Sequence, residues 1–210
     1  MSIKLKGSTD GSVTLTAPAD TSPTGTDKTF TLPTADGTSG QVLTTNGSGA
    51  LSFANEGKIL QVLQAVKDDA LSVSLATLTE SSNILSQAIT VAASSKVLVS
   101  CTLCLSSGTT LNGLSLNRDG TNIGIHESAG NRYRGTATWY KDSDSGIANQ
   151  TVTVMFLDTP GSAGTYTYGV KLRHGSSATQ TVYVNTYSDD QDISKRIKGI
   201  STLTLMEVAA

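Results

Sequence analysis

Apolar and polar residues alternate in short runs over most of the chain from residue 58 onward. Residues 71–75 read Leu-Ser-Val-Ser-Leu, and residues 97–103 alternate in the same way. A period of two is typical of β-strands, because successive side chains of a strand point to opposite faces of the sheet. Further runs of this kind occupy residues 85–91, 114–116, 133–139, 152–156, 166–172, 182–184 and 200–208.

Turn-forming sequences separate these runs. Asn-Arg-Asp-Gly stands at residues 117–120 and Pro-Gly at residues 160–161, and two more polar turns fall at 142–146 and 174–177. Strands at this spacing are typical of an antiparallel β-sandwich or barrel. The pattern therefore predicts an all-β domain over residues 58–210.

Residues 59–66 are ambiguous, because Ile59, Val62, Leu63 and Val66 fit the spacing of a helix as well as that of a buried strand. We favour a strand here, because every later segment of the chain has the β pattern.

The first 57 residues have a different composition. They contain three of the four prolines and few large apolar residues, and they are rich in Gly, Ser, Thr and Asp. Such a segment cannot bury enough apolar surface to offset its chain entropy. Residues 1–57 are therefore predicted to form an N-terminal arm or short stalk that partners order, and residues 58–210 to form a separate knob domain.

A weak repeat lies within this arm. Residues 13–20 (VTLTAPAD) resemble residues 29–36 (TFTLPTAD) at an offset of 16, and residues 41–53 read as a hairpin around a Gly-rich turn. Short strand-turn units of this kind bury a core only when they are stacked or wound with other copies. The alternative is a plain linker whose two phrases are similar by chance.

Composition excludes several classes of protein. Charged residues make up 15% of the chain and the net charge is −2, so binding of nucleic acid through phosphate neutralisation is not expected. No run of about 18 apolar residues occurs, so no membrane insertion is expected. The first six residues lack the apolar core of a secretion signal, which predicts synthesis in a cytoplasm.

The residues that could carry catalysis or bind metal form no recognisable site. Cys101 and Cys104 are three apart, so on a strand they face opposite sides and a disulfide between them is not expected. His126 and His174 are too few for a zinc site. No G-x-S-x-G sequence suggests a serine hydrolase. We predict no catalytic residue, no cofactor and no metal site.

The acidic residues support this prediction. A glycosidase needs two opposed carboxylates, and no pair of them stands in a distinctive setting. The acidic sequences at 142–146 and 189–192 lack the full ligand set of a calcium loop, so they are read as polar turns. The carboxylates considered for a glycosidase are Glu56, Glu80, Glu127, Asp142, Asp158 and Asp189.

The densest aromatic and cationic stretch, residues 132–141, contains the only tryptophan. Exposed aromatic rings beside arginines suit contact with a glycan or a protein. In the alternative that we favour, Tyr133, Ala137 and Trp139 alternate into the core and the two arginines face water. The candidate surface-contact residues are Arg132, Arg134, Tyr140 and Lys141.

Several phrases follow one another along the chain in an order that resembles structural proteins of tailed bacteriophages. In these proteins a short module precedes a C-terminal β-domain. The phrases are LPTADGT at 32–38, GQVLTTNG at 40–47, GKILQV at 57–62, SKVLV at 95–99, RDGT at 118–121, FLD at 156–158 and GISTLTLMEV at 199–208.

The resemblance implies a non-enzymatic virion protein. It implies a homotrimeric surface appendage with a jelly-roll-like knob, attached to other virion proteins (capsid or tail) through residues 1–57 and made in the host bacterial cytoplasm. Two versions remain open: a tail fibre that binds a host surface glycan or protein, and a head fibre or capsid cement protein. The chain has no long shaft, which favours the second. A polysaccharide depolymerase is a further alternative, but the strand spacing does not suggest its usual long β-helix.

Overall fold

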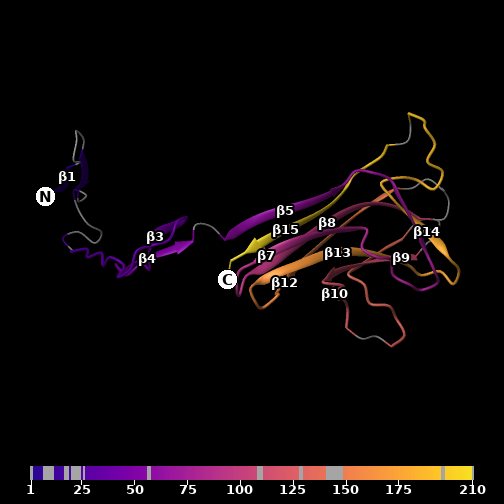
Figure 1. Cartoon of the computed structure of the whole chain (residues 1–210), viewed down its shortest axis with the longest axis horizontal. Helices are drawn as coiled ribbons and strands as arrows, with labels where there is room; N and C mark the ends of the chain where they lie inside the picture. The colour runs from indigo at the N-terminus through magenta and orange to yellow at the C-terminus, as the bar shows by residue number, and fades with distance from the viewer. Residues whose placement is uncertain are drawn as a thin grey trace. The chain divides into compact units, whose positions relative to one another are not determined.

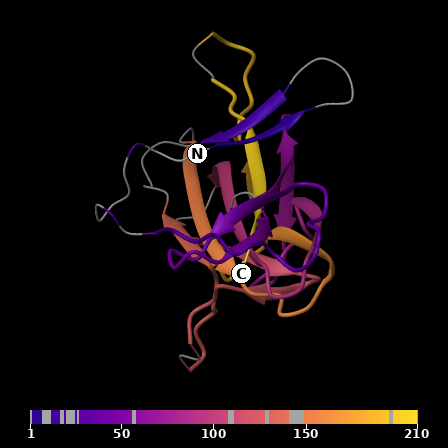
Figure 2. The same ribbon diagram turned by 90° about the vertical axis from the view of Figure 1, so that its left-hand side faces the viewer.

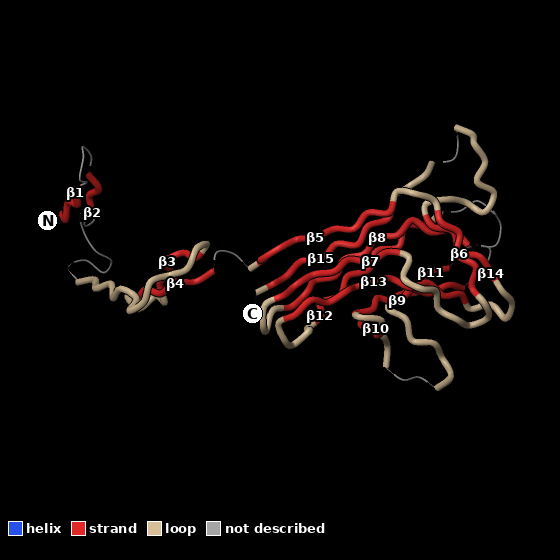
Figure 3. The backbone as a smooth tube through the Cα atoms, viewed as in Figure 1, coloured by secondary structure: helices blue, strands red, loops and turns tan. Residues whose placement is uncertain are grey.

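The structure, a computed structural model, describes residues 2–6, 12–16, 19, 25, 27–55, 58–107, 111–127, 130–140, 149–194 and 197–209. The chain divides into two compact units, Met1–Gly57 and Lys58–Ala210. Every regular element in the described residues is a β-strand, as Figure 3 shows. The all-β fold class is therefore confirmed. No helix in the described part is long and apolar enough to cross a membrane.

The N-terminal unit contains two β-hairpins. Strands β1 (Ser2–Lys6) and β2 (Ser12–Thr16) pair with each other, and so do β3 (Gln41–Thr45) and β4 (Leu51–Asn55). The second hairpin was predicted from residues 41–53. Its turn is closed by Asn46, whose Oδ1 accepts hydrogen bonds from the backbone N–H of Ser48 (2.8 Å) and Ala50 (3.2 Å).

The two phrases of the weak repeat adopt different structures. The first contributes to β2, whereas residues 29–36 form no strand and make only a bridge between Thr31 and Ala50. The Thr31 N–H donates to Gly49 O and the Thr31 carbonyl accepts from Leu51 N–H, both at 2.9 Å. Pro33, which has no N–H to donate, follows two residues later. The similarity of the phrases therefore does not reflect one repeated structural unit.

The C-terminal unit is an antiparallel β-sandwich, which confirms the predicted architecture (Figure 1 and Figure 2). One sheet has the order β10-β9-β13-β7, and β11 also pairs with β9. Its strands are β7 (Leu85–Val91), β9 (Leu111–Arg118), β10 (Thr121–Ile123), β11 (Ala137–Tyr140) and β13 (Gly164–His174). The other sheet has the order β5-β15-β8-β14-β6, and β12 also pairs with β8. Its strands are β5 (Ile59–Lys67), β6 (Leu71–Leu75), β8 (Lys96–Ser107), β12 (Gln150–Asp158), β14 (Gln180–Val184) and β15 (Ser201–Val208).

Most strand boundaries agree with the alternation. Residues 59–66 lie in β5, so the choice of a strand over a helix is confirmed. The run at 133–139 is the exception, because β11 begins only at Ala137. Tyr133 is held outside the sheet by contacts of its ring and hydroxyl group, described below. The short strand β10, directly after the turn at 117–120, has no counterpart in the prediction.

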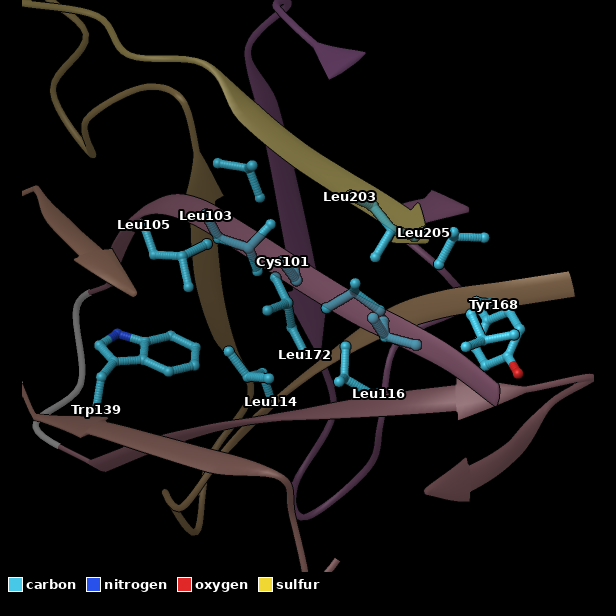
Figure 4. Packing of buried hydrophobic residues seen from close by; sticks show 14 of the residues in the cluster. Cys101, Leu103, Leu105, Leu114, Leu116, Trp139, Tyr168, Leu172, Leu203 and Leu205 are labelled. Atoms are coloured by element: carbon cyan, nitrogen blue, oxygen red, sulfur yellow. The ribbon is translucent and has the colours of Figure 1, made fainter. Parts of the chain in front are cut away.

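The core lies between the two sheets, as Figure 4 shows. Alternate residues of β8 point inward and are fully buried, among them Val99, Cys101 and Leu103. They face Leu116 and Leu172 of the other sheet, which are also fully buried. Burial of each such side chain contributes about 1.5–3 kcal/mol. The C-terminal unit therefore has a hydrophobic core of its own.

Charged groups also join the two sheets. Asp158 of β12 accepts hydrogen bonds at Oδ2 from Arg118 of β9 (2.5 Å) and from the Tyr168 hydroxyl of β13 (2.7 Å). Tyr168 is fully buried, and burial raises the pKa of its hydroxyl group. These contacts satisfy a buried carboxylate and fix the spacing of the sheets at that point.

Candidate functional site

The residues predicted for surface contact lie on and before β11. Arg132 and Arg134 are exposed and belong to the segment that connects β10 to β11. Tyr140 is the last residue of β11 and is 60% exposed, whereas Trp139 is buried in the core. Lys141 lies outside the described residues. The favoured alternative is therefore confirmed for Trp139, which is buried, and for Arg132 and Arg134, which face water.

Tyr133 is not a core residue, so its predicted inward orientation is wrong. Its ring lies under the Arg173 guanidinium, with the Arg173 Cζ 3.8 Å from the ring centroid. Its hydroxyl group is 2.6 Å from Ser115 Oγ and also donates to Glu80 Oε1. A cation–π contact and two hydrogen bonds hold the ring on the outer surface of the sheet. Tyr133 thus anchors the segment that carries Arg132 and Arg134.

Glu80 is the centre of this anchor. It also accepts a hydrogen bond from Asn122 Nδ2 (2.9 Å), and its Oε2 lies 3.8 Å from Lys171 Nζ. A backbone bridge joins Glu80 to Arg173. Burial lowers the pKa of Arg173, and the nearby Glu80 carboxylate opposes this shift. Glu80 is therefore engaged in a structural network of ionic and hydrogen-bonding groups.

Sequence reasoning did not connect these residues. Glu80, Ser115, Asn122 and Arg173 come from separate segments of the chain and share no local motif. Their positions follow only from strand pairing, because β9 pairs with β13 and brings Ser115 opposite Lys171.

A hollow of about 390 Å³ lies beside this anchor. Arg132 and Arg134 line it, and they have no ion-pair partner within the described part of the chain. His126 also lines it, with its Nδ1 3.0 Å from the Glu127 carbonyl oxygen. An open hollow lined by two arginine residues suits the binding of a carboxylate or phosphate group. Its lining residues are His126, Arg132, Tyr133, Arg134, Gly135, Thr136, Ala137 and Thr138.

The thiols and the other histidine have structural surroundings. Cys101 is buried and Cys104 half-buried, and both are free, as their spacing predicted. Burial raises the pKa of Cys101 to about 12 and also raises that of Cys104. Neither thiol is an activated nucleophile at neutral pH. His174 is buried, with Nε2 3.0 Å from the Leu75 carbonyl oxygen.

The acidic candidates are dispersed. Asp158 and Glu80 are engaged in the contacts described above, and Glu127 is exposed. Asp189 lies in an exposed loop, and Glu56 and Asp142 fall outside the described residues. Among the residues that the structure describes, no three His, Cys, Asp or Glu side chains are grouped so that they could hold a metal ion.

Comparison with known proteins adds little. No protein-family model and no curated protein matches the chain. A chain in the solved structure of the Gx strain of infectious bursal disease virus is similar at 11% identity and a TM-score of 0.31. The match covers 76% of this chain and 39% of that chain. At this TM-score the likeness supports no argument about fold or function.

Proposed function

We propose that the chain is a non-enzymatic structural protein of a tailed-bacteriophage particle. Residues 1–57 attach it to other virion proteins, and residues 58–210 form a knob on the particle surface. Three copies assemble into one appendage.

The difference in burial between the two units carries this proposal. Within residues 27–54 no side chain is buried, and Phe30 (64%), Leu32 (70%) and Leu43 (50%) are exposed. An isolated two-stranded hairpin is at best marginally stable in water. The apolar residues of the N-terminal unit therefore need a partner surface, whereas the knob buries its own core. A binding arm on a self-sufficient domain is the organisation expected of an attached appendage.

The order of the bacteriophage-like phrases supports the particle as the partner. The phrase LPTADGT runs along β4, where residues 31–36 and 50–53 line a groove of about 410 Å³. GQVLTTNG forms β3 and its turn, and TLTLMEV lies in the core strand β15. The phrases thus lie both in the arm and in the core of the knob.

Particle incorporation tests the attachment role. A chain that lacks residues 1–57 is expressed during infection, and purified particles are analysed for it beside particles made with the full chain. We expect the truncated chain to be absent from particles while its Trp139 emission shows a folded knob. Incorporation of the truncated chain at the normal level would contradict the proposal.

The cationic hollow favours the host-binding version of this function. Bacterial surface polymers carry carboxylate and phosphate groups, which Arg132 and Arg134 suit. We expect the full chain to bind host cells and the double variant R132A/R134A to bind at least about tenfold more weakly. The variant K58A/K96A removes the same charge elsewhere and is expected to bind normally. Equal binding by all three proteins would favour the cement version.

The absence of catalysis is also part of the proposal. Incubation of the full chain with host polysaccharide is expected to leave the polymer length unchanged, and the appearance of shortened fragments would show a depolymerase instead.

A further inference from the structure

The outward side of four adjacent strands, β5, β15, β8 and β12, carries exposed apolar residues. The strand register places Val62, Met206, Leu98 and Leu157 in one row across them. Val62 is 54% exposed and Leu157 47%. Met155 and Val66 belong to the next two rows and are 63% and 52% exposed. Apolar groups in contact with water over a continuous area indicate a surface that another molecule covers.

The three rows together contain no charged residue. We call them the neutral face. Its polar members pair with one another: Gln64 Nε2 donates to Thr204 Oγ1 (2.8 Å), and the Thr102 and Thr153 hydroxyl groups are 3.2 Å apart. Covering this face therefore desolvates few unsatisfied polar groups. Its rows are Val62–Met206–Leu98–Leu157, Gln64–Thr204–Ser100–Met155 and Val66–Thr202–Thr102–Thr153.

The outward side of the other sheet is different. There β13 presents Thr167, Lys171 and Arg173, and β7 presents Ser86 and Ala88. This side carries the charged and hydroxyl groups that suit contact with water. The sandwich thus has one water-compatible side and one neutral, apolar side.

The chemistry of the neutral face fits further copies of itself. A partner of either charge gains nothing from a face without charges, whereas identical neutral faces bring no like charges together. Hydroxyl and amide groups both donate and accept hydrogen bonds, so the face can satisfy its own polar groups.

The width of the face fits three copies around one axis. Four strands at about 4.8 Å spacing are about 19 Å wide.

Three faces about 19 Å wide, arranged as a triangular prism, each lie about 5.5 Å from the central axis. Packed sheets are about 10 Å apart, so the side chains of one sheet fill about 5 Å. The side chains of three neutral faces would therefore fill the space around the axis.

We propose that the neutral face of β5, β15, β8 and β12 is the surface through which three copies of this chain assemble, with the face of each copy lining the threefold axis. This inference rests on the self-assembly in the proposed function and assigns it a surface. It leaves the polar side of the sandwich and the Arg132–Arg134 hollow outside the assembly.

The test places a charge on β8, one of the two middle strands of the face. Ser100→Lys brings three ammonium groups close to the axis, and like charges opposed at an interface cost several kcal/mol, so the dissociation constant is expected to rise about a hundredfold or more. Ala88→Lys is the matched control, because it adds the same charge to an exposed strand position on the other side of the sandwich. Sedimentation of the full chain measures the mass of each protein, and Trp139 emission checks that each is folded.

We expect three times the 21.7 kDa chain mass for the unchanged protein and the Ala88→Lys control, and 21.7 kDa for folded Ser100→Lys. A second variant, Thr204→Lys, adds the charge on the other middle strand, β15, and is expected to behave like Ser100→Lys. Trimers of both face variants would overturn the proposed surface, while leaving attachment through residues 1–57 unaffected. A monomer of the unchanged protein would overturn both this surface and the assembly on which it rests.

Discussion

Glu207 closes one end of the sandwich and gives a sharp prediction for stability. Its side chain is buried, although it carries a carboxylate. The carboxylate accepts hydrogen bonds from Gln61 Nε2 (2.6 Å) and from the Ala92 N–H (2.7 Å), which directly follows β7 of the opposite sheet. Gln61 Nε2 also donates to the Thr90 carbonyl oxygen (2.6 Å), so its amide orientation is fixed. Glu207 therefore joins the two sheets directly through Ala92 and indirectly through Gln61. Both groups must act as donors to Glu207, because one is a backbone N–H and the other is an amide whose orientation is fixed.

The substitution Glu207→Gln preserves the size of this side chain and changes its chemistry. The new amide has one acceptor and one donor, so its NH₂ group must face either Ala92 N–H or the Gln61 amide. A hydrogen bond to a charged group contributes about 1.5–3 kcal/mol, and a buried donor without an acceptor adds a further cost. Since the two bonds share one carboxylate and are not additive, we expect a loss of about 3 kcal/mol at pH 7.

The effect depends on pH in a defined direction. Burial alone would raise the pKa of Glu207, but hydrogen bonds from Gln61, Ala92 and Ser95 outweigh it, so the pKa lies below 4.5. The unfolded chain therefore takes up this proton first as the pH falls. The stabilisation by Glu207 is complete above about pH 4.5 and is lost as the pH falls through the lower pKa of the folded protein. The difference in free energy of unfolding between the unchanged protein and Glu207→Gln should shrink over the same pH range.

Denaturant unfolding followed by the emission of Trp139 measures this difference, because this side chain is buried in the same sandwich. Unfolding at pH 7 and at about pH 3 would give the two values. Stabilities that agree within about 0.5 kcal/mol at pH 7, or a difference undiminished at low pH, would refute the role given to the Glu207 carboxylate.

Two further predictions use the same sandwich. Leu203 is fully buried, so Leu203→Ala should lower the free energy of unfolding by about 2–5 kcal/mol. Val62 is exposed, so Val62→Ala should cost far less in a monomer. Similar losses for both variants would contradict the assignment of inner and outer faces. In the folded protein at pH 8, a thiol reagent should modify half-buried Cys104 well before Cys101, whose pKa burial raises to about 12. Both thiols should react at the same rate in denaturant. Equal rates in the folded state would show that Cys101 is accessible.

The alternation of apolar residues predicted the sandwich well for a physical reason. In β8 the inward positions from Val97 to Leu105 are all apolar, so inner residues such as Val99 and Leu103 could be identified before the structure. The outward side of β12 was harder to interpret. Met155 and Leu157 are apolar but exposed, and period-two reasoning alone does not reveal that both sides of a strand can carry apolar groups.

The candidate site was predicted only in part. The exposed arginines and buried Trp139 follow from local alternation, but Tyr133 does not, because its ring and hydroxyl bind residues of other strands. Glu80 stands out in no local motif, and its role arises from its contact with Tyr133 and Lys171 after the sheet has formed. Contacts between segments that are distant in the sequence could therefore not be predicted from the sequence alone.

Image reconstruction of the virus particle tests the central claim most directly. We expect a threefold knob of β-sandwiches on the particle surface, with residues 1–57 in contact with a capsid or tail protein and the neutral faces turned to the axis. A particle in which this chain is absent, or present only as single knobs that contact the shell through residues 58–210, would contradict the account.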